Sequence, residues 1–368
     1  MTELNDLAHQ LDPTRKTCIR RCDFCSDIVD VYSPTIWAGW YSHSFRDYRE
    51  MEEAAMAKYP RFFHAEWGGD SHVGRFTDSD YQDMIQGDKY GDWSESYIVR
   101  LFDWTLHEQM RMPNLTGSAF WTFKDFATPL RPDNPIPYVN QKGVVQRDGT
   151  PKESYYVFQS YWTEKPMIHI LGHTWRRRYG KPNEPKEIMV YSNVPEVELF
   201  VNGKSAGRRR RNADDFPAAG LRWSVLLKEG DNLIRAVGYP LKAPSVEDSM
   251  TMALQTESWD KPSRIVLRQE GDLIHAQIVD HKGVSCLNAT NWITFSIAGD
   301  GSLLQNQGTA TGSRHIQAAN GHAAIRVKSF GNACTVSAQS TNLKTATISL
   351  DNKEKMKQRD NITSMAAS

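Results

Sequence analysis

The segment Arg61–Asp70, RFFHAEWGGD, contains the carboxylate best placed in this sequence for catalysis. Phe62 to Ala65 predict a short buried strand, which Gly68 and Gly69 stop. Glu66 falls at the carboxyl end of that strand, where catalytic groups collect in parallel α/β folds. A lone carboxylate is costly to bury unless it is paired or used. Glu66 is therefore either a catalytic group or an exposed residue at the start of a loop.

Two neighbours could assist Glu66. His64 precedes it by two residues, so alternation along a strand places both side chains on one face. His64 could be a satisfied core histidine, but a substrate-binding role, as a hydrogen-bond donor to a ligand, is the favoured expectation. Trp67 follows directly, and seven of the eleven tryptophans lie before residue 163. Aromatic walls suit the C–H faces of sugar rings, although core packing is their commoner use.

The sequence CIRRCDFC brings three cysteines close together, Cys18, Cys22 and Cys25. This CxxxCxxC spacing matches the motif by which radical S-adenosylmethionine enzymes hold a [4Fe–4S] cluster. The alternative is that Cys18 and Cys22 lie on a buried strand and Cys25 starts the next loop. Five cysteines in all do not make a disulfide framework, so the redox compartment stays open.

Charge and hydropathy favour neither nucleic acid nor a membrane as partner. The formal net charge is zero, and no apolar run approaches the ~20 residues of a membrane span. The run Arg208–Arg211 could contact phosphates, but a solvated hairpin face balanced by Asp214 and Asp215 fits better. No signal peptide is visible at the start of the chain, which leaves its localisation unknown.

The first half of the chain alternates strands with helices, which predicts a parallel sheet with crossover helices. Strands are predicted at 16–21, 27–32, 62–65 and 117–123, and helices at 4–11, 45–58, 93–110 and 151–162. Asp92 and Glu95 resemble a capping box at the start of the third helix. A closed (β/α)₈ barrel takes about 250 residues, so residues 1–165 predict only part of one.

From Pro166 onward the hydrophobic pattern has a period of two, typical of β-sandwiches. Asn202-Gly203 is a strong hairpin signal. Later strands are predicted at 264–268, 273–279, 292–297, 323–327, 334–338 and 345–350. The sizes of the blocks 166–255 and 256–352 each predict an immunoglobulin-like sandwich. Residues 353–368 are predicted to be a disordered tail.

Several of these motifs, in this order, resemble glycoside hydrolase family 2, the family of β-galactosidases and β-glucuronidases. They are Asp12-Pro13-Thr14-Arg15, Asp27 to Tyr32, Ala65-Glu66-Trp67-Gly68, Gly117 to Asp125, Pro151-Lys152-Glu153, the Val197–Gly207 hairpin and Asn320-Gly321-His322. The resemblance implies a retaining exo-β-glycosidase that needs no cofactor, with the strands here as the fifth to eighth of a TIM barrel. Glu66 then matches the nucleophile. The family's general acid, the Glu of an Asn-Glu pair after the fourth strand, is expected outside this chain, so the chain alone is expected to be inactive or feeble.

The resemblance also implies substrate-binding residues. Trp121 matches the aromatic floor under the terminal sugar, with Lys124 just after it. Trp37 and Tyr41 fall in the sixth-strand loop.

Asn140-Gln141-Lys142 resembles the Asn-x-Lys of β-glucuronidases, in which an amide and an ammonium hold the sugar carboxylate. This keeps a uronic acid level with galactose as the substrate sugar. The expected substrate is an oligosaccharide or glycoside. The expected protein partner is the N-terminal half of the family fold or a second copy of the chain. A non-catalytic carbohydrate-binding protein is the alternative in which Glu66 is dispensable.

Overall fold

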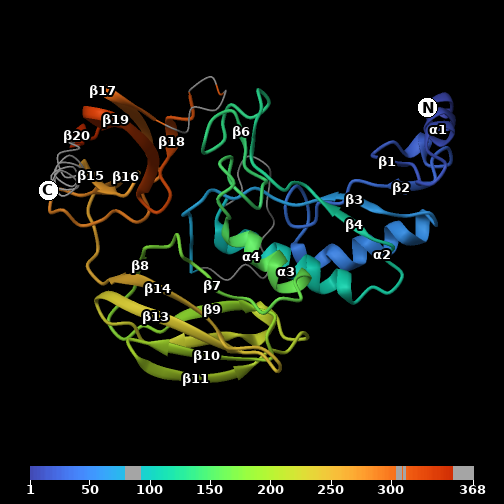
Figure 1. The fold of residues 1–368 in the computed structure, drawn as a ribbon, viewed down its shortest axis with the longest axis horizontal. Helices are drawn as coiled ribbons and strands as arrows, with labels where there is room; N and C mark the ends of the chain where they lie inside the picture. Colours follow the sequence, from blue (N-terminus) through green and yellow to red (C-terminus); the bar gives the residue numbers. More distant parts are fainter. Residues whose placement is uncertain (79–92, 304–308, 310–311, 351–368) are drawn as a thin grey trace, which may run out of the picture. The chain divides into compact units, whose positions relative to one another are not determined.

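The computed structural model describes residues 1–78, 93–303, 309 and 312–350 (Figure 1). Contacts within it group into two compact units. Unit 1 comprises residues 1–126, 141–176 and 180–254. Unit 2 comprises residues 127–140, 177–179 and those from 255 onward. The predicted tail, residues 353–368, lies outside the described residues. None of the helices in the described ranges is long and apolar enough to cross a membrane.

Unit 1 begins with four short strands that run parallel to one another. They are β1 (Cys18–Arg20), β2 (Val31–Ser33), β3 (His64–Trp67) and β4 (Ser118–Phe120). β1 pairs with β2 and β3 with β4, and a parallel bridge between Tyr32 and Phe62 joins the two pairs. Helix α2 (Tyr48–Lys58) lies between β2 and β3 in the sequence, and α3 (Glu95–Met110) between β3 and β4. The predicted alternation of parallel strands with helices is confirmed.

The strand predicted at residues 27–32 is shorter than expected. Residues 27–30 form a turn, and the strand proper begins at Val31. The Asp30 carboxylate accepts hydrogen bonds from the Thr17 amide, at 2.8 Å, and contacts His9 Nε2 at 2.7 Å. These contacts hold the Asp30 side chain toward the first helix, α1 (Thr2–Leu11). The pairing of β2 with β1 therefore starts after Asp30, at Val31.

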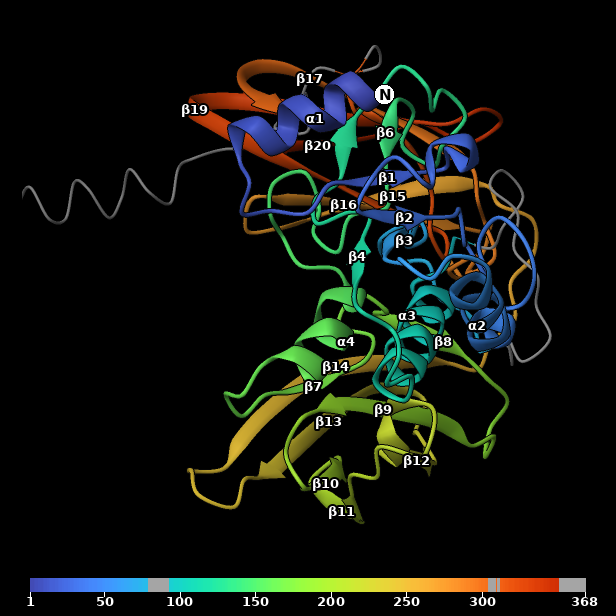
Figure 2. The same ribbon diagram turned by 90° about the vertical axis from the view of Figure 1, so that its right-hand side faces the viewer.

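Helix α3 supplies much of the core around the parallel strands. Its cap is Ser94, whose Oγ accepts the Tyr97 amide at 3.1 Å, and not the predicted Asp92, which lies outside the described residues. Figure 2 shows α3 beside α4 (Glu153–Trp162). Phe102 of α3 and Phe158 of α4 pack with Trp67 and Phe120, with ring centroids 4.8 to 5.7 Å apart. This aromatic cluster anchors β3 and β4 on the helices.

The rest of unit 1 consists of two antiparallel sheets with a shared core. One sheet contains β12 (Arg222–Val225), β9 (Lys186–Ser192) and β7 (Ile168–Ile170); the other contains β11 (Lys204–Arg210), β10 (Glu196–Val201), β13 (Gly230–Tyr239) and β14 (Val246–Gln255). Val190 and Trp223 of the first sheet belong to one buried cluster with Leu199 and Ile234 of the second. The predicted hairpin is present, with Asn202 at φ 51° and Gly203 at φ 81° between β10 and β11.

The arginine run lies on an exposed strand, β11, as the sequence predicts. Its partners differ from those expected. Arg208 pairs with Glu198 at 3.2 Å and Arg210 with Glu196 at 2.9 Å. The acids are supplied by the neighbouring strand β10 because side chains opposite each other in a ladder face the same side. Asp214 and Asp215 pair instead with Arg111 and Arg222.

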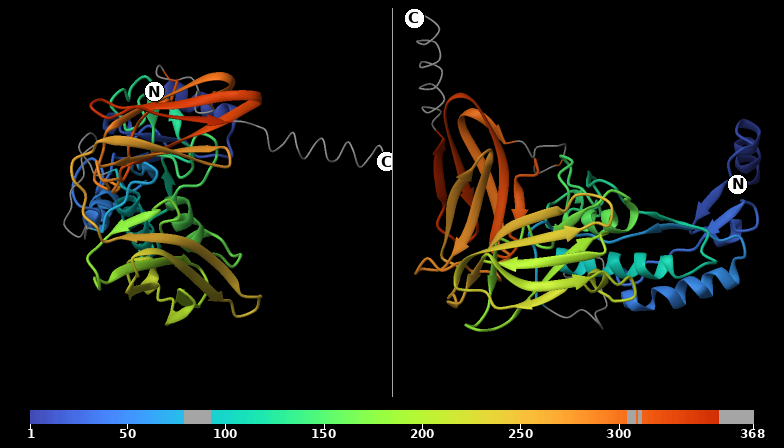
Figure 3. Two further views of the ribbon diagram at one scale, coloured as in Figure 1. Left: turned by 90° about the vertical axis from the view of Figure 1, so that its left-hand side faces the viewer. Right: turned by 60° about the horizontal axis from the view of Figure 1, so that its bottom comes forward.

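Unit 2 is built mainly from six strands. They are β15 (Arg264–Glu270), β16 (Leu273–Val279), β17 (Trp292–Leu303), β18 (His315–Gln317), β19 (His322–Gln339) and β20 (Ala346–Leu350). The strands predicted at 323–327 and 334–338 form one long strand, β19 (Figure 3). The first part of β19 pairs with β16, and its later part pairs with β17 and β20. The two predicted strands merge because the residues that join them stay extended, with Ser329 opposite Gly301 of β17. Shorter strands complete the structure: β5 (Phe126–Ala127), β6 (Val139–Asn140) and β8 (Arg177–Tyr179).

Candidate active site

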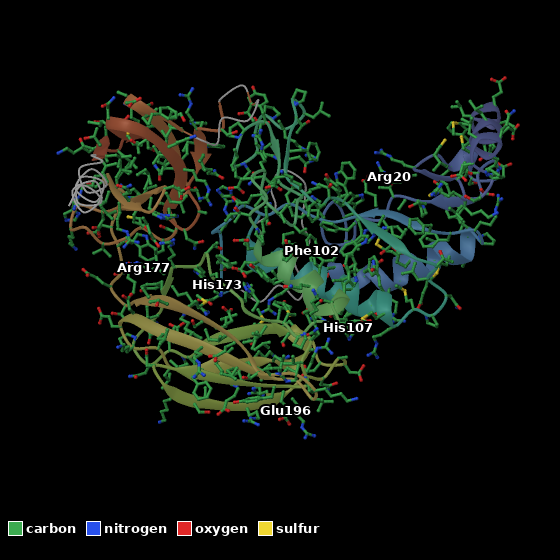
Figure 4. The ribbon with its side chains drawn as sticks, in the orientation of Figure 1. Arg20, Phe102, His107, His173, Arg177 and Glu196 are labelled. Atoms are coloured by element: carbon green, nitrogen blue, oxygen red, sulfur yellow. The ribbon has the colours of Figure 1, made fainter. Side chains whose placement is uncertain are left out.

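Glu66 lies in the carboxyl-terminal half of β3 and faces an arginine. Arg20, the last residue of β1, places its Nε 3.2 Å from Glu66 Oε2. The Arg20 label in Figure 4 marks this end of the parallel strands. The Arg20 side chain is 33% exposed and that of Glu66 is 19% exposed, so a ligand can reach the pair. The contact between the two side chains fixes the orientation of the carboxylate. A partly buried carboxylate with a fixed orientation suits nucleophilic attack.

Trp67 and Trp121 are joined by a backbone hydrogen bond, but their side chains differ in exposure. The Trp121 amide donates to the Trp67 carbonyl oxygen at 2.7 Å. Trp67 is buried, and its indole Nε1 donates to Ser118 Oγ at 3.3 Å. Trp121, which precedes a cis peptide bond, is 43% exposed. Only Trp121 therefore presents an open ring beside the Glu66 strand, while Trp67 fills the core.

Lys142 lies within an aromatic cluster. Its ammonium is 5.6 Å from the ring centroid of Trp37, 5.3 Å from that of Trp40 and 5.1 Å from that of Tyr41. It also pairs with the Asp70 carboxylate, and both side chains are only 2% exposed. A buried ammonium needs such a partner, because taking an unpaired charge out of water is expensive. The cluster gathers the predicted residues Trp37, Tyr41 and Lys142 at one place.

The two other predicted polar residues, Lys124 and Asn140, differ in exposure. Lys124 is exposed, and its backbone forms a parallel bridge with Val145. Asn140 ends β6 and is buried.

His64 is fully buried in a polar network beneath the parallel strands. Its Nε2 lies 3.1 Å from the Ile36 carbonyl oxygen, so this nitrogen carries a proton. Its Nδ1 lies 3.0 Å from the Tyr48 hydroxyl and 2.9 Å from Glu52 Oε1. The geometry therefore favours the core-histidine interpretation. The β3–β4 ladder shifts register between His64 and Trp67, which breaks the strict alternation that put His64 on the face of Glu66.

A second buried ion pair supports the loop that carries Lys142, and sequence reasoning missed it. Lys152 Nζ lies 2.9 Å from Asp125 Oδ1 and donates to the carbonyl oxygens of Ser71 and Gln141 at 3.1 and 2.8 Å. Burial raises the pKa of Asp125 to about 6, although the Lys152 ammonium acts in the opposite direction. In the sequence Pro151-Lys152-Glu153 is only a family motif, and no spacing rule links it to Asp125.

Two of the three cysteines contact each other. Cys22 and Cys25 bring their sulfurs to 2.7 Å, while Cys18 is exposed. A hydrogen bond with Cys22 raises the pKa of the Cys25 thiol. In a [4Fe–4S] cluster each thiolate binds a separate iron, whereas Cys22 and Cys25 contact each other directly. The arrangement gives no support to an iron–sulfur cluster.

A buried carboxyl near the start of α3 should make stability depend on pH. Burial and the nearby Glu153 carboxylate raise the pKa of Glu95 from 4.5 to about 7. The folded chain then binds the Glu95 proton more tightly than the unfolded chain does. The stability that the protonated carboxyl contributes is fully present below pH 4.5 and is lost as the pH rises toward 7. We expect this group to lower the free energy of unfolding by about 3 kcal/mol between these limits.

Urea unfolding of the wild type and of Glu95→Gln at pH 5 and pH 7 measures the effect. The amide does not ionise, so the difference between the two proteins should change with pH. Glu184→Gln is the control, because contacts with Lys186 and the Lys181 amide keep the pKa of Glu184 below 4.5. Parallel pH dependences for the wild type and Glu95→Gln would contradict the assignment.

Comparison with known proteins identifies the family. Residues 266–349 match the model of glycoside hydrolase family 2 C-terminal domain 5, and residues 183–243 match a domain of unknown function. The structure of Bacteroides uniformis beta-glucuronidase 3 is 62% identical, with a TM-score of 0.89, and the match covers 95% of this chain and 46% of that one. Parabacteroides merdae beta-glucuronidase is 53% identical, with a TM-score of 0.88 and coverage of 95% and 47%.

A Formosa agariphila protein is 45% identical over 353 residues, which is 90% of this chain and 43% of that protein. The chain thus spans about half the length of these relatives. The chain belongs to glycoside hydrolase family 2 and corresponds to the C-terminal portion of such an enzyme.

Proposed function

We propose that the chain carries the nucleophile of a retaining exo-β-glucuronidase, and that its four parallel strands are the fifth to eighth of a (β/α)₈ barrel. Glu66 attacks the anomeric carbon of a terminal β-linked glucuronic acid, and the bond to the leaving oxygen breaks. Water then hydrolyses the glycosyl-enzyme ester with retention. Arg20 holds the attacking carboxylate in one orientation through the contact at 3.2 Å. Covalent capture divides one difficult displacement into two easier steps.

The general acid of this reaction has to come from outside these residues. Retaining chemistry needs two carboxyl groups ~5–5.5 Å apart, and in this family the acid is the Glu of an Asn-Glu pair that precedes the nucleophile. The only such pair in the sequence, Asn183-Glu184, follows Glu66. Glu184 is engaged with Lys186 at 2.7 Å. We therefore propose that the general acid lies outside residues 1–368, in a part corresponding to the half of the relatives' length that the match does not cover.

The observation that carries the choice of sugar is the buried Lys142 among Trp37, Trp40 and Tyr41. A cation at the edge of a sugar site recognises a carboxylate, and a neutral hexose offers it no charge. Asp70 neutralises Lys142. A glucuronate carboxylate would share or displace that contact. Trp121, with its open ring, is the platform on which the sugar ring stacks. The two solved structures described above are both named as β-glucuronidases.

A 2-deoxy-2-fluoro-glucuronosyl fluoride tests the assignment, because fluoride leaves without protonation and the fluorine slows release of the ester. The reagent is applied to the chain joined behind the N-terminal half of the Bacteroides uniformis relative. We expect intact mass spectrometry to show one glucuronosyl adduct, on the peptide that contains Glu66. Labelling of another carboxylate, or none in a folded chimera, overturns the proposed nucleophile. Faster labelling by the galactosyl analogue overturns the proposed sugar.

A further inference from the structure

A cluster of two histidines and two carboxylates joins α4 to the sandwich strands of unit 1. His169 lies on β7, His173 in the turn that follows, Asp248 on β14, and Glu153 is the first residue of α4. Figure 4 labels His173 between α4 and these strands. None of these side chains takes part in the chemistry assigned to Glu66.

His169 holds a nitrogen lone pair toward Asp248. Its Nε2 lies 2.7 Å from Glu153 Oε2, so in the neutral imidazole the proton sits on Nε2 and Nδ1 is the acceptor. Its Nδ1 is 3.9 Å from Asp248 Oδ2, which is too far for a hydrogen bond. The ring is fixed by Tyr156, which stacks on it with centroids 3.5 Å apart. With the His169 side chain only 6% exposed, a buried acceptor thus faces a carboxylate oxygen.

His173 approaches the same oxygen. Its Nε2 is 2.8 Å from Asp248 Oδ2, which also accepts the Ile170 amide at 2.7 Å. The ligand atoms of His169, His173 and Asp248 all lie within 4.8 Å of one another. Zinc–ligand bonds of about 2.0–2.1 Å place tetrahedral ligands roughly 3.3 Å apart. The distances of 2.8 and 3.9 Å bracket that value, so small side-chain shifts would complete the geometry.

We propose that His169 Nδ1, His173 Nε2 and Asp248 Oδ2 bind one Zn²⁺, with water as the fourth ligand. Two imidazoles and one carboxylate suit zinc and not magnesium or calcium, which take oxygen ligands. Glu153 plays the outer role usual at zinc sites, since a carboxylate that accepts the far N–H fixes the tautomer of a histidine ligand. The ion ties α4 to β7 and β14 and so stabilises the helix whose first turn follows Lys152.

Zinc binding is measured on the full 368-residue chain, stripped with a chelator and titrated with ZnCl₂ by calorimetry. Elemental analysis gives the stoichiometry, and we expect one tightly bound ion per chain. His173→Ala removes a ligand whose side chain is 36% exposed, so the fold should survive. We expect its affinity to fall by roughly 10²-fold or more, and that of Glu153→Gln by roughly 10- to 100-fold.

Two control variants separate this site from others. His281→Ala alters the group of Asp260, Asp280 and His281 in unit 2, where Asp280 already accepts three backbone amides. The pair Cys22→Ser and Cys25→Ser removes the neighbouring thiols. Both should bind zinc as the wild type does.

Cobalt substitution of the wild type supplies a second measurement that needs no variant. We expect visible bands of a tetrahedral ion without a thiolate-to-cobalt band. Unchanged affinity in His173→Ala, loss of the site in either control, or a thiolate band overturns the proposal.

Discussion

Replacing Glu66 with glutamine is expected to lower kcat/KM for an aryl β-D-glucuronide by at least about 10³-fold in the chimera described above. Loss of a nucleophile removes the covalent route entirely, and such losses are large in enzymes that use one. The free energy of unfolding should change by less than about 1 kcal/mol, because Arg20 and Glu66 are both partly exposed and such pairs contribute little. Glu196→Gln, on the exposed face of the sandwich, is the matched control and should keep its activity.

Azide separates a lost nucleophile from a damaged site. In Glu66→Ala, azide can enter the space left by the carboxylate and attack the anomeric carbon from that side. The carbon–oxygen bond to an activated phenolate breaks as the carbon–nitrogen bond forms, which gives the α-glucuronosyl azide. Nuclear magnetic resonance identifies the product. A β-azide, or equal activity in Glu66→Gln and the wild type, would falsify the role of Glu66.

Sequence reasoning succeeded where the cause is local. Asn202-Gly203 specifies its turn by backbone preference alone, and the parallel strands follow from short apolar runs between helices. The position of Glu66 at the end of a strand is of the same kind. Each of these signals is contained within about ten residues, so a single sequence can display them.

The partners of the site residues could not be predicted, because they come from distant parts of the chain. Nothing near Arg20 points to Glu66, and nothing near Lys142 points to Asp70. Such pairs arise when strand ends meet at one edge of the sheet, and their identity depends on register. The shift between His64 and Trp67 shows the effect, since it sends His64 into the core despite its spacing from Glu66.

Replacing Lys142 with methionine is expected to lower kcat/KM for the aryl β-D-glucuronide by roughly 10²- to 10³-fold, because a desolvated charge partner of the substrate is lost. Turnover of the matching β-D-galactoside should change much less, since that sugar has no carboxylate. Initial rates on both substrates in the chimera measure the ratio. Equal losses on the two sugars would mean that Lys142 supports the structure and does not select the sugar.

The same substitution leaves the buried Asp70 carboxylate without its cation, which typically destabilises a fold by about 3–5 kcal/mol. The double variant Asp70→Asn with Lys142→Met removes both charges, and the asparagine Oδ1 can still accept the Gln141 amide that Asp70 accepts at 3.1 Å. Its stability should therefore return toward that of the wild type while its activity on the glucuronide stays low. If glucuronide turnover recovers together with stability, the loss in the single variant came from unfolding, and the carboxylate of the substrate is held elsewhere.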